Sequence, residues 1–527
     1  MRKHIKSSLF LCLGLIILSA GCKKDLNKLS VNENKPTTAP ANLILTGVLT
    51  NLYDRPFSSY EVWDQYYLNN YDYYGNNRYD FGSGNVYYTT LKNVIKMEEE
   101  ATKAGQETVN PYTAMGKFFR AYFFTKMSLQ LGDIPMTQAL KGTENLTPVY
   151  DSQKDVFKQS LTWLEEANTE FASVIANKKG SIDGDIYFGN DLSKWQKTVN
   201  SFKLRLLIEL SKKENDTDLN IKQQFANIIN NPTKYPIFQS SADNLQFIYN
   251  DKTNKYPNNP ENYGFDNSRN NSSATYVGLL TQAKDPRVFV TNEPARYYVD
   301  QLNQSPTDFN SFVGADPGLD LGIMYSNAGL QKYSFINRKR YYSTFTAEPS
   351  VQIGYPEMCF NIAEAINRGW VSGNAEGWYI KGIQSSWDFY GIPTTGSFTA
   401  YFYKPGATDP TKSQNYNSYT VNTNWANYYL QADVKYAGNN ATGINQIINQ
   451  KYLAMFRHSG LEAFYNYRRT GIPNFTTGVG TGNSGRIPLR FKYPNSELTS
   501  NSDNYQSALQ SQYAGKDDIN LAPWIIK

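Results

Sequence analysis

Side chains that act as nucleophiles, general bases or metal ligands are scarce in this chain. Its 527 residues include only three cysteines and two histidines. Cys12 and His4 fall in an N-terminal leader that we expect to be removed, which leaves Cys22, Cys359 and His458. A zinc site built from Cys and His needs about four ligands, so we expect no metal bound by these residue types, and we expect no cofactor. Any nucleophile–base pair would have to use His458, Cys359, a lysine or a carboxylate.

Neither Cys359 nor His458 has neighbours in the sequence that favour catalysis. Cys359 lies between two large apolar residues, where a free cysteine is usually a small buried hydrophobe. His458 lies at the junction of two expected helices, and we expect it to be structural. The carboxylate pair of a glycoside hydrolase, about 5 to 10 Å apart, is set by the fold and leaves no sequence pattern. A surface hydrolase therefore stays open as an alternative.

The strongest candidate for ligand contact is the segment from Tyr60 to Tyr88, where aromatic residues alternate with amide and charged ones. Aromatic faces stack on the apolar faces of sugar rings, while amide, carboxylate and guanidinium groups hydrogen-bond to hydroxyls. The predicted contacts are Trp63, Tyr67, Tyr71, Tyr73, Tyr74, Asn76, Arg78 and Tyr79. The alternative is that the helical spacing of Trp63, Tyr67 and Tyr71 marks a buried helix face.

A second candidate segment runs from residue 419 to 436, where we predict ligand contacts by Trp425 and Tyr428. The glycine-rich stretch 476–485 is not a third candidate for ligand contact. It lacks the lysine and the strand–helix context of a phosphate-binding loop, so we expect an ordinary loop there.

The first 21 residues are predicted to be a signal peptide. Arg2, Lys3 and Lys6 form a positive start, a short apolar run follows, and small residues lead to Gly21. The run is shorter than the ~20 apolar residues that a membrane-spanning helix needs, so we expect cleavage and not a retained membrane helix.

Cys22 follows this leader in a setting that resembles the lipobox of bacterial lipoproteins, although Ser19 stands where leucine is usual. The resemblance implies that the Cys22 thiol carries lipid in the mature protein. Two or more acyl chains give stable anchoring, at about 0.8 kcal/mol per buried methylene. We expect residues 22–40, which are mostly polar, to form a lipidated, flexible tether.

Composition narrows the choice of partners. Without the leader, 49 of the 52 basic side chains remain against 47 acidic ones, a net charge near +2. So small a charge does not indicate nucleic acid or an anionic membrane surface as a partner. The 41 Tyr, 28 Phe and 8 Trp residues suit sugar rings and mixed interfaces, and they also suit an aromatic core.

Helical patterns alternate with long irregular stretches. Helices are expected at 111–131, 154–177, 193–210, 356–366, 379–390, 444–457 and 461–469, the third opened by a capping box of Ser193 and Gln196. The stretches 231–350, 391–440 and 470–527, with boundaries only approximate, are expected to be ordered ligand-face loops with few short strands. The predicted fold is mainly α-helical, with helix pairs forming a scaffold packed against a loop-rich region in a single domain, 41–527. No clean 34-residue repeat is present.

Several stretches in a fixed order resemble one family. They are "GKFFRAYFFTKMSLQLGDIPMTQAL" (116–140), "WQKTVNSFKLRLLIELS" (195–211), "DPRVFV" (285–290), "GYPEMCFNIAEAINRGWVSGNAEGWYIKGIQSSWDFYGI" (354–392), "QKYLAMFRHSGLEAFYNYRRTGIP" (450–473) and "RIPLRFKYPNSE" (486–497). Behind a lipoprotein signal, they resemble the SusD/RagB-like outer-membrane lipoproteins of Bacteroidetes, and the SusD-like 2 branch in particular. Their charged positions are Arg120, Arg205, Glu364, Arg468 and Arg469, which we expect to be paired scaffold residues.

The resemblance implies a fold and a role. The fold is a set of tetratricopeptide-like helix pairs packed against an irregular ligand-binding region. The role is to capture a nutrient at the cell exterior, an oligosaccharide or a peptide, and to deliver it as a lid to a SusC-like TonB-dependent transporter, a β-barrel of the outer membrane. It implies binding without cleavage. The alternatives are an oligopeptide ligand, the hydrolase above, or an adhesin that acts without a transporter. The ligand and a structural Ca²⁺ stay open.

Overall fold

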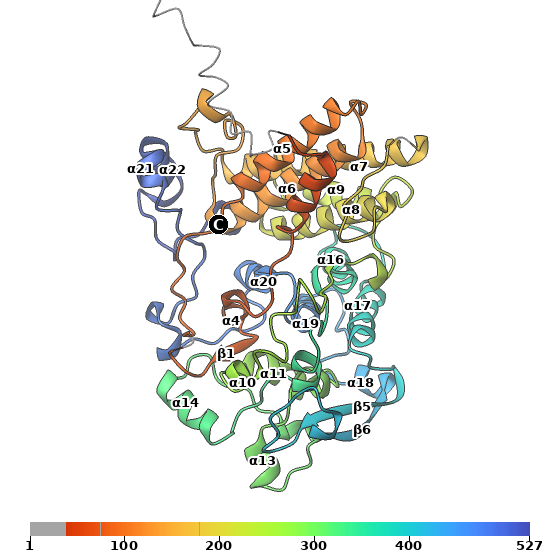
Figure 1. Ribbon diagram of the computed structural model, residues 1–527, viewed down its shortest axis with the longest axis vertical. Coiled ribbons are helices and arrows are strands. Elements are labelled where there is room, and N and C mark those ends of the chain that lie inside the picture. Colours follow the sequence, from red (N-terminus) through yellow and green to blue (C-terminus); the bar gives the residue numbers. More distant parts are fainter. Residues whose placement is uncertain (1–37, 74, 179) are drawn as a thin grey trace, which may run out of the picture. The chain divides into compact units, whose positions relative to one another are not determined.

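The computed structural model describes residues 38–73, 75–178 and 180–527. Residues 41–527 form one compact unit that is mostly helical (Figure 1). The longer helices are α3 (Ala41–Leu49), α5 (Tyr88–Lys103), α6 (Pro111–Leu131), α7 (Gln153–Asn177), α8 (Leu192–Glu209), α9 (Ile221–Asn230), α11 (Ala274–Gln282), α14 (Leu321–Gly329), α16 (Tyr355–Asn367), α17 (Ala375–Phe389), α19 (Ala441–Ala454), α20 (Glu462–Thr470) and α22 (Ser502–Tyr513). The short ones are α4 (Ser59–Trp63), α10 (Tyr263–Asp266), α12 (Val288–Thr291), α13 (Arg296–Asp300), α15 (Arg338–Tyr342), α18 (Trp425–Tyr429) and α21 (Glu497–Ser500).

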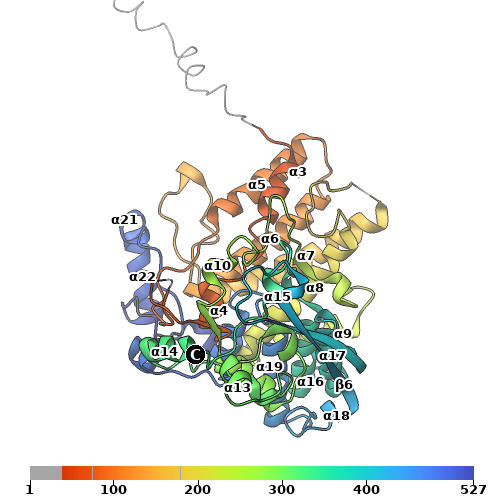
Figure 2. The same ribbon diagram turned by 60° about the horizontal axis from the view of Figure 1, so that its bottom comes forward.

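The strands form three separate antiparallel pairs. They are β1 (Tyr67–Asn69) with β3 (Asn270–Ser272), β2 (Leu245–Phe247) with β4 (Ser350–Ile353), and β5 (Thr395–Tyr403) with β6 (Tyr416–Asn424). The third pair is a regular hairpin in which Thr395 faces Asn424 and Tyr403 faces Tyr416. Figure 2 shows it as a long ribbon that runs between α15 and α18.

Two regions of the compact unit differ in character. Helices α5 to α9 lie together at one end in Figure 1, with α16, α17, α19 and α20 next to them. The opposite end holds β1, α10, α13, α14 and the β5–β6 hairpin. The helical end is the scaffold, and the other end is the irregular region that carries the largest surface hollows described below.

Helix α6 shows how the sequence builds the scaffold. The Asn110 side chain accepts hydrogen bonds from the amides of Tyr112 and Thr113, and Pro111 stands at the first helical position, where no amide is needed. The helix is buried on nearly every side, and Phe118 packs on Trp195 and Phe202 of α8 with ring centroids 5.7 and 5.8 Å away. Burial of this aromatic face, not helical propensity, holds the helix in place.

The five charged residues expected to be scaffold residues are paired, as predicted from the sequence. The contacts are Arg120 to Glu98, Arg205 to Glu357, Arg469 to Glu364, and Arg468 to the carbonyls of Leu129 and Leu489. Burial alone would raise the pKa of Glu364, but the guanidiniums of Arg469 and Arg368 hold it down to about 2. The pair therefore stays charged at neutral pH and joins α20 to α16.

The predicted fold class is confirmed: the chain is mainly helical and its strands are few. Two local expectations are wrong. The N-cap of α8 is Asp191, whose carboxylate accepts from the amides of Ser193 and Lys194, so Ser193 lies inside the helix. The stretch 391–440 is not mainly loop, because the nine-residue strands β5 and β6 fill much of it. Among the described residues, no helix is both long and apolar enough to span a membrane.

Candidate functional site

A surface hollow of about 780 Å³ lies beside α4 and β1. Its lining combines aromatic, amide and charged side chains with a few small residues. The main lining residues are Phe57, Trp63, Tyr67, Asn69, Asn76, Arg78, Asp80, Asn262, Arg269 and Asn270. We call it the Trp63 hollow. Its volume falls within the ~300–1,000 Å³ that is typical of small-molecule sites.

The β1–β3 pair fixes one wall of this hollow. Helix α4 ends at Trp63, and Gln65 then takes a positive φ of 54°, which turns the chain into β1. Asn69 stands opposite Asn270, and the Asn270 amide donates to the Asn69 side-chain oxygen at 2.9 Å. Two amide side chains from distant parts of the sequence therefore meet at the wall of the hollow.

The loop 75–80 fixes the opposite rim through a buried asparagine. Asn77 accepts a hydrogen bond from the Asn69 amide and donates one to the Asn69 carbonyl, both 2.8 Å long, so its side chain imitates a strand partner. The residues on either side of it, Asn76 and Arg78, are exposed. The Trp63 indole N–H donates to the Arg78 carbonyl at 3.2 Å. The rim is therefore tied to the aromatic wall by main-chain contacts.

Arg78 and Asp80 form an ion pair across the rim. The distance from Nε to Oδ2 is 2.9 Å, and each side chain is 56% exposed. A pair this exposed contributes about 0–1 kcal/mol to folding. Both groups can therefore turn to the hydroxyls of a ligand at little cost.

Four of the residues predicted from the sequence line the Trp63 hollow: Trp63, Tyr67, Asn76 and Arg78. Trp63 also packs on Phe81, with ring centroids 4.5 Å apart, and Tyr67 is almost fully buried. The buried helix face considered as an alternative does not form, since α4 ends before Tyr67. Part of each ring nevertheless belongs to the core.

Tyr71 and Tyr73 lie beside this hollow and do not line it. The Tyr71 ring is 5.2 Å from the Tyr325 ring and 5.4 Å from the guanidinium carbon of Arg269. Tyr73 is 78% exposed, and its ring centroid is 6.4 Å from that of Tyr71. Tyr74 and Cys22 lie outside the described residues.

Tyr79 and Tyr428 were predicted to contact the ligand, and the structure contradicts this because both side chains are buried. Tyr79 is 1% exposed, and its hydroxyl donates to the Trp63 carbonyl and accepts from Gln65. Tyr428 is 5% exposed, and its hydroxyl donates to the Asp285 carboxylate. Both side chains are buried and hydrogen-bonded within the protein, so neither can contact a ligand unless its surroundings unfold.

Trp425 does not join the Trp63 hollow either. It is half-buried on α18, with its ring 5.3 Å from Trp387 of α17 and stacked at 5.6 Å on Tyr429. The 419–436 segment is thus a packing element around α17. It supplies no residue to the lining of the hollow.

The sequence prediction missed Asn262, Arg269 and Asn270, which complete the hollow. They belong to the stretch 256–273, which has the same mixture of Asn, Tyr and Arg as the segment 60–88. That shared composition could have marked 256–273 as a second part of the same site. It could not predict the β1–β3 pairing that brings the two stretches together.

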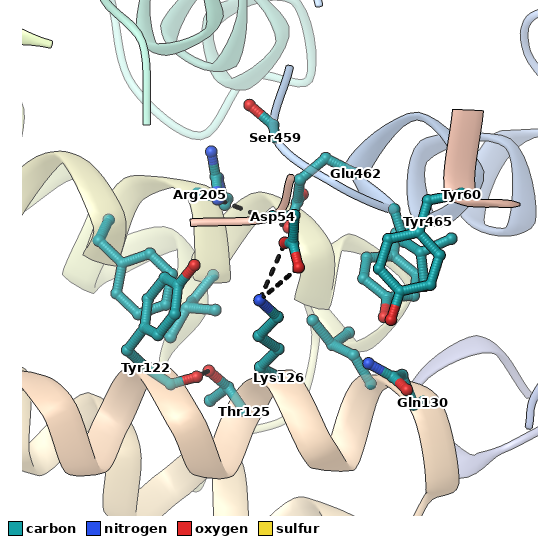
Figure 3. A pocket seen from close by; sticks show the side chains of 14 residues that line it. Asp54, Tyr60, Tyr122, Thr125, Lys126, Gln130, Arg205, Ser459, Glu462 and Tyr465 are labelled. Atoms are coloured by element: carbon teal, nitrogen blue, oxygen red, sulfur yellow. Dashed lines mark hydrogen bonds and ion pairs between the residues drawn. The ribbon is translucent and has the colours of Figure 1, made fainter. Parts of the chain in front are cut away.

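A second kind of cavity lies inside the helical scaffold. Figure 3 shows it between α6, α8 and the segment that leads into α20, where Lys126 pairs with Asp54 beside Arg205 and Glu462. Its volume is about 30 Å³, which is the share of a single water molecule in the liquid. It is too small for a nutrient, and its charges join the N-terminal segment to the helices.

The remaining reactive side chains are structural, as predicted from the sequence. Cys359 is a buried free thiol, and burial raises its pKa to about 12, far from a reactive thiolate. His458 is buried beside Glu348, and desolvation lowers its pKa to about 4. Among the described residues, no group of three or more His, Cys, Asp or Glu could hold a metal ion.

Comparisons with known proteins agree with this architecture. The SusD-like 2 family, described as starch-binding and associating with the outer membrane, matches residues 32–494. No curated protein matches the chain. Two crystal structures of SusD homologues from Bacteroides fragilis are similar along nearly the whole chain. One is 29% identical with a TM-score of 0.79 and the other 32% identical with a TM-score of 0.75, each over 93% of this chain and 100% of its own.

A chitin-binding SusD homologue from Flavobacterium johnsoniae shares the fold at 18% identity, with a TM-score of 0.67 over 92% of this chain and 98% of its own. The family match covers far more than half of the sequence and begins shortly after Cys22. The helical scaffold and the irregular region are both included in it. The chain therefore belongs to the SusD-like 2 family of nutrient- and glycan-binding outer-membrane proteins.

Proposed function

We propose that this protein captures an oligosaccharide in the Trp63 hollow and delivers it, as a lid, to a SusC-like TonB-dependent transporter in the outer membrane. It is anchored through lipid on Cys22 and faces the exterior. The observation that supports the ligand class most is the lining of the hollow. Trp63 presents aromatic surface beside the nearly buried ring of Tyr67, and Asn69, Asn76 and Arg78 present donors and acceptors around it.

The lining also favours binding over hydrolysis. The only described carboxylate that lines the Trp63 hollow is Asp80, and Arg78 already pairs with it. Retaining and inverting glycosidases both need two carboxyl groups across the scissile bond, about 5 to 10 Å apart. Incubation of the protein with oligosaccharides should therefore leave their lengths unchanged, and release of shorter products would contradict a pure binding role.

The ligand class can be tested by calorimetry on the full chain, purified in detergent. We expect heat of binding with at least one oligosaccharide from a panel of starch, chitin and plant cell-wall fragments, and none with oligopeptides of similar size. If only peptides bind, the ligand is an oligopeptide and the glycan proposal is wrong. The description of the family as starch-binding supports the glycan.

Variants at the exposed rim test the location. Asn76→Ala and Arg78→Gln remove ligand contacts but no core packing, so we expect each to weaken binding about tenfold, the effect of one charge-assisted or well-placed hydrogen bond, with little change in melting temperature. The matched control is Arg55→Gln, an exposed arginine that does not line the hollow. Unchanged affinity in both rim variants would place the ligand elsewhere.

The transporter can be tested by purifying the tagged protein from native membranes. We expect a large β-barrel to accompany it in amounts close to one per copy. Repeated absence of any barrel would favour the adhesin alternative over the lid.

A further inference from the structure

A second surface hollow, of about 440 Å³, lies next to the Trp63 hollow. It is formed by the connection into β3, the start of α13, the helices α14 and α15, and the turn between β5 and β6. We call it the Arg338 hollow. The lining residues used below are Arg269, Glu293, Arg296, Arg338 and Lys404. Its volume is also within the range of small-molecule sites.

The two hollows are neighbours that share a wall. Arg269 lines both of them. Asn69 lines the Trp63 hollow and the next residue, Asn70, lines the Arg338 hollow, as expected at the end of a strand whose successive side chains point to opposite sides. The Tyr71 ring lies within 5.4 Å of the Arg269 guanidinium and 5.2 Å of Tyr325, which lines the Arg338 hollow. An extended ligand can therefore pass from one hollow to the other over Arg269 and Tyr71.

The Arg338 hollow carries an excess of positive charge. Its described lining side chains include four cations, Arg269, Arg296, Arg338 and Lys404, and one carboxylate, Glu293. Arg296 is paired with Asp300, whose Oδ2 lies 2.9 Å from its Nε. Glu293 is already engaged, because its Oε2 lies 2.8 Å from Nη1 of Arg338 and its Oε1 accepts from the Arg338 amide at 3.0 Å. Cations in a concave, weakly solvated site attract an anion more strongly than they would on a flat surface.

One cation of this hollow, Lys404, lacks a partner among the described residues. Arg338 is held by the Glu293 carboxylate and by the Asn267 carbonyl, to which its Nη2 donates at 3.0 Å. The Lys404 side chain, half-buried directly after β5, makes no ion pair with any described residue, whereas its backbone amide donates to the Asn415 carbonyl and its carbonyl accepts from the Ala407 amide. A buried or half-buried cation without a partner is costly unless a ligand supplies the counter-charge.

We infer that the Arg338 hollow is a second subsite that binds an anionic group, and that the ligand is an acidic oligosaccharide bearing carboxylates or sulfates. This inference rests on the proposed function: a sugar ring occupies the Trp63 hollow, and a charged unit of the same chain lies against Lys404 and Arg338. A neutral glucan would leave Lys404 without a counter-charge. The acidic unit also explains why the hollow beside an aromatic glycan site is basic in a protein whose net charge is close to zero.

A glycan array that displays both neutral and acidic oligosaccharides is the first test, with the full chain in detergent. We expect the bound glycans to be acidic. Uronate-containing chains such as oligogalacturonides and sulfated chains such as chondroitin sulfate tetrasaccharide distinguish the two sources of charge. Binding of an oligogalacturonide should be lost on methyl esterification, which keeps the sugar and removes the charge, and should weaken as salt is added.

The matched variants are Lys404→Gln and Lys412→Gln. Both lysines lie in the connection between β5 and β6, but only Lys404 lines the hollow. We expect Lys404→Gln to weaken binding of the acidic glycan about tenfold and Lys412→Gln to leave it unchanged. Because Lys404 has no side-chain role in the core, both variants should melt at the temperature of the parent.

The outcomes separate the inference from the proposed function. If neutral glycans bind and acidic ones do not, or if Lys404→Gln binds an acidic glycan as tightly as the parent, the anionic subsite is refuted while glycan capture stands. If no glycan binds at all, the proposed function fails and the inference falls with it.

Discussion

His458 is the single histidine among the described residues, and its imidazole lies in a buried cluster of charges. Its Nδ1 accepts from the Val351 amide at 3.4 Å, and its Nε2 is 3.9 Å from the Glu348 carboxylate. Desolvation lowers its pKa to about 4, and Arg340 and Arg457 act in the same direction, against Glu348. The neutral form is therefore part of the folded structure.

This lowered pKa predicts acid sensitivity with a definite sign. Between pH 6.5 and pH 4 the unfolded chain binds a proton at His458 that the folded protein does not, so stability rises with pH in this window and is lost as the pH falls through it. The difference in pKa corresponds to about 3 kcal/mol of unfolding free energy. In His458→Asn, which keeps an acceptor for the Val351 amide, that part of the pH dependence should disappear.

Urea unfolding at a series of pH values measures the effect. The parent should lose more unfolding free energy than His458→Asn on acidification, by up to about 3 kcal/mol near pH 4. The buried carboxylates titrate in both proteins and cancel in the comparison. Equal pH slopes would show that His458 is not held neutral.

At the scale of single residues, the sequence pattern located side chains of one hollow but did not show which of them are buried. The mixture of rings and amides in 60–88 correctly pointed to residues that line a hollow, including Trp63, Asn76 and Arg78. It could not show that Tyr79 turns inward. Alternation of burial along 76–80 follows from Asn77 acting as a strand partner of Asn69, a contact with no local signature.

Among the elements, the glycine-rich loop 476–485 has a role that its composition did not indicate. Gly482 has φ of 61° and ψ of −150°, a region open essentially to glycine alone, and a Cβ there would lie 3.1 Å from Nε of Arg78. The loop thus borders the guanidinium at the rim of the Trp63 hollow. We regard Gly482 as a positioning residue for Arg78.

Gly482→Ala should therefore weaken ligand binding several-fold as well as cost about 1–3 kcal/mol of stability from backbone strain. Gly485→Ala is the matched control, because its φ of 70° is also positive while the nearest atom to its Cβ is Oγ1 of Thr477, 4.0 Å away. Calorimetry and thermal unfolding of both variants separate the effects. Equal loss of affinity in the two would refute a positioning role for the loop.

The predicted helices agree with the structure to within a few residues where the apolar pattern is long, as in α6 and α7. The irregular region was predicted only as loops. Its hairpin β5–β6 has one exposed and one partly covered face, and its position is fixed by packing on α12 and α15, far away in sequence. Such long-range pairings hold the two hollows in place. Local sequence patterns cannot predict them, because the paired segments are far apart in the chain.

In the whole molecule, the ligand surface and the anchor belong to different parts of the chain. Both hollows are lined by residues from Phe57 onward. The predicted lipid site is Cys22, and residues 22–37 lie outside the described residues. On the proposed function, the segment 22–40 has to let the compact unit open and close over a transporter while it stays attached. The length of this segment should therefore affect ligand uptake.

Deletion of residues 26–35 tests this requirement. For a solvated chain of 19 residues the root-mean-square span is roughly 24 Å, and removal of ten residues reduces it to roughly 16 Å. We expect the deletion to retain membrane attachment, incorporation of a palmitate analogue at Cys22 and affinity for the ligand, but to reduce uptake of that ligand by cells. A replacement of residues 26–35 by ten Gly and Ser residues restores the length and should restore uptake, whereas Cys22→Ser should abolish attachment. Normal uptake by the deletion would show that the lid does not depend on the reach of its tether.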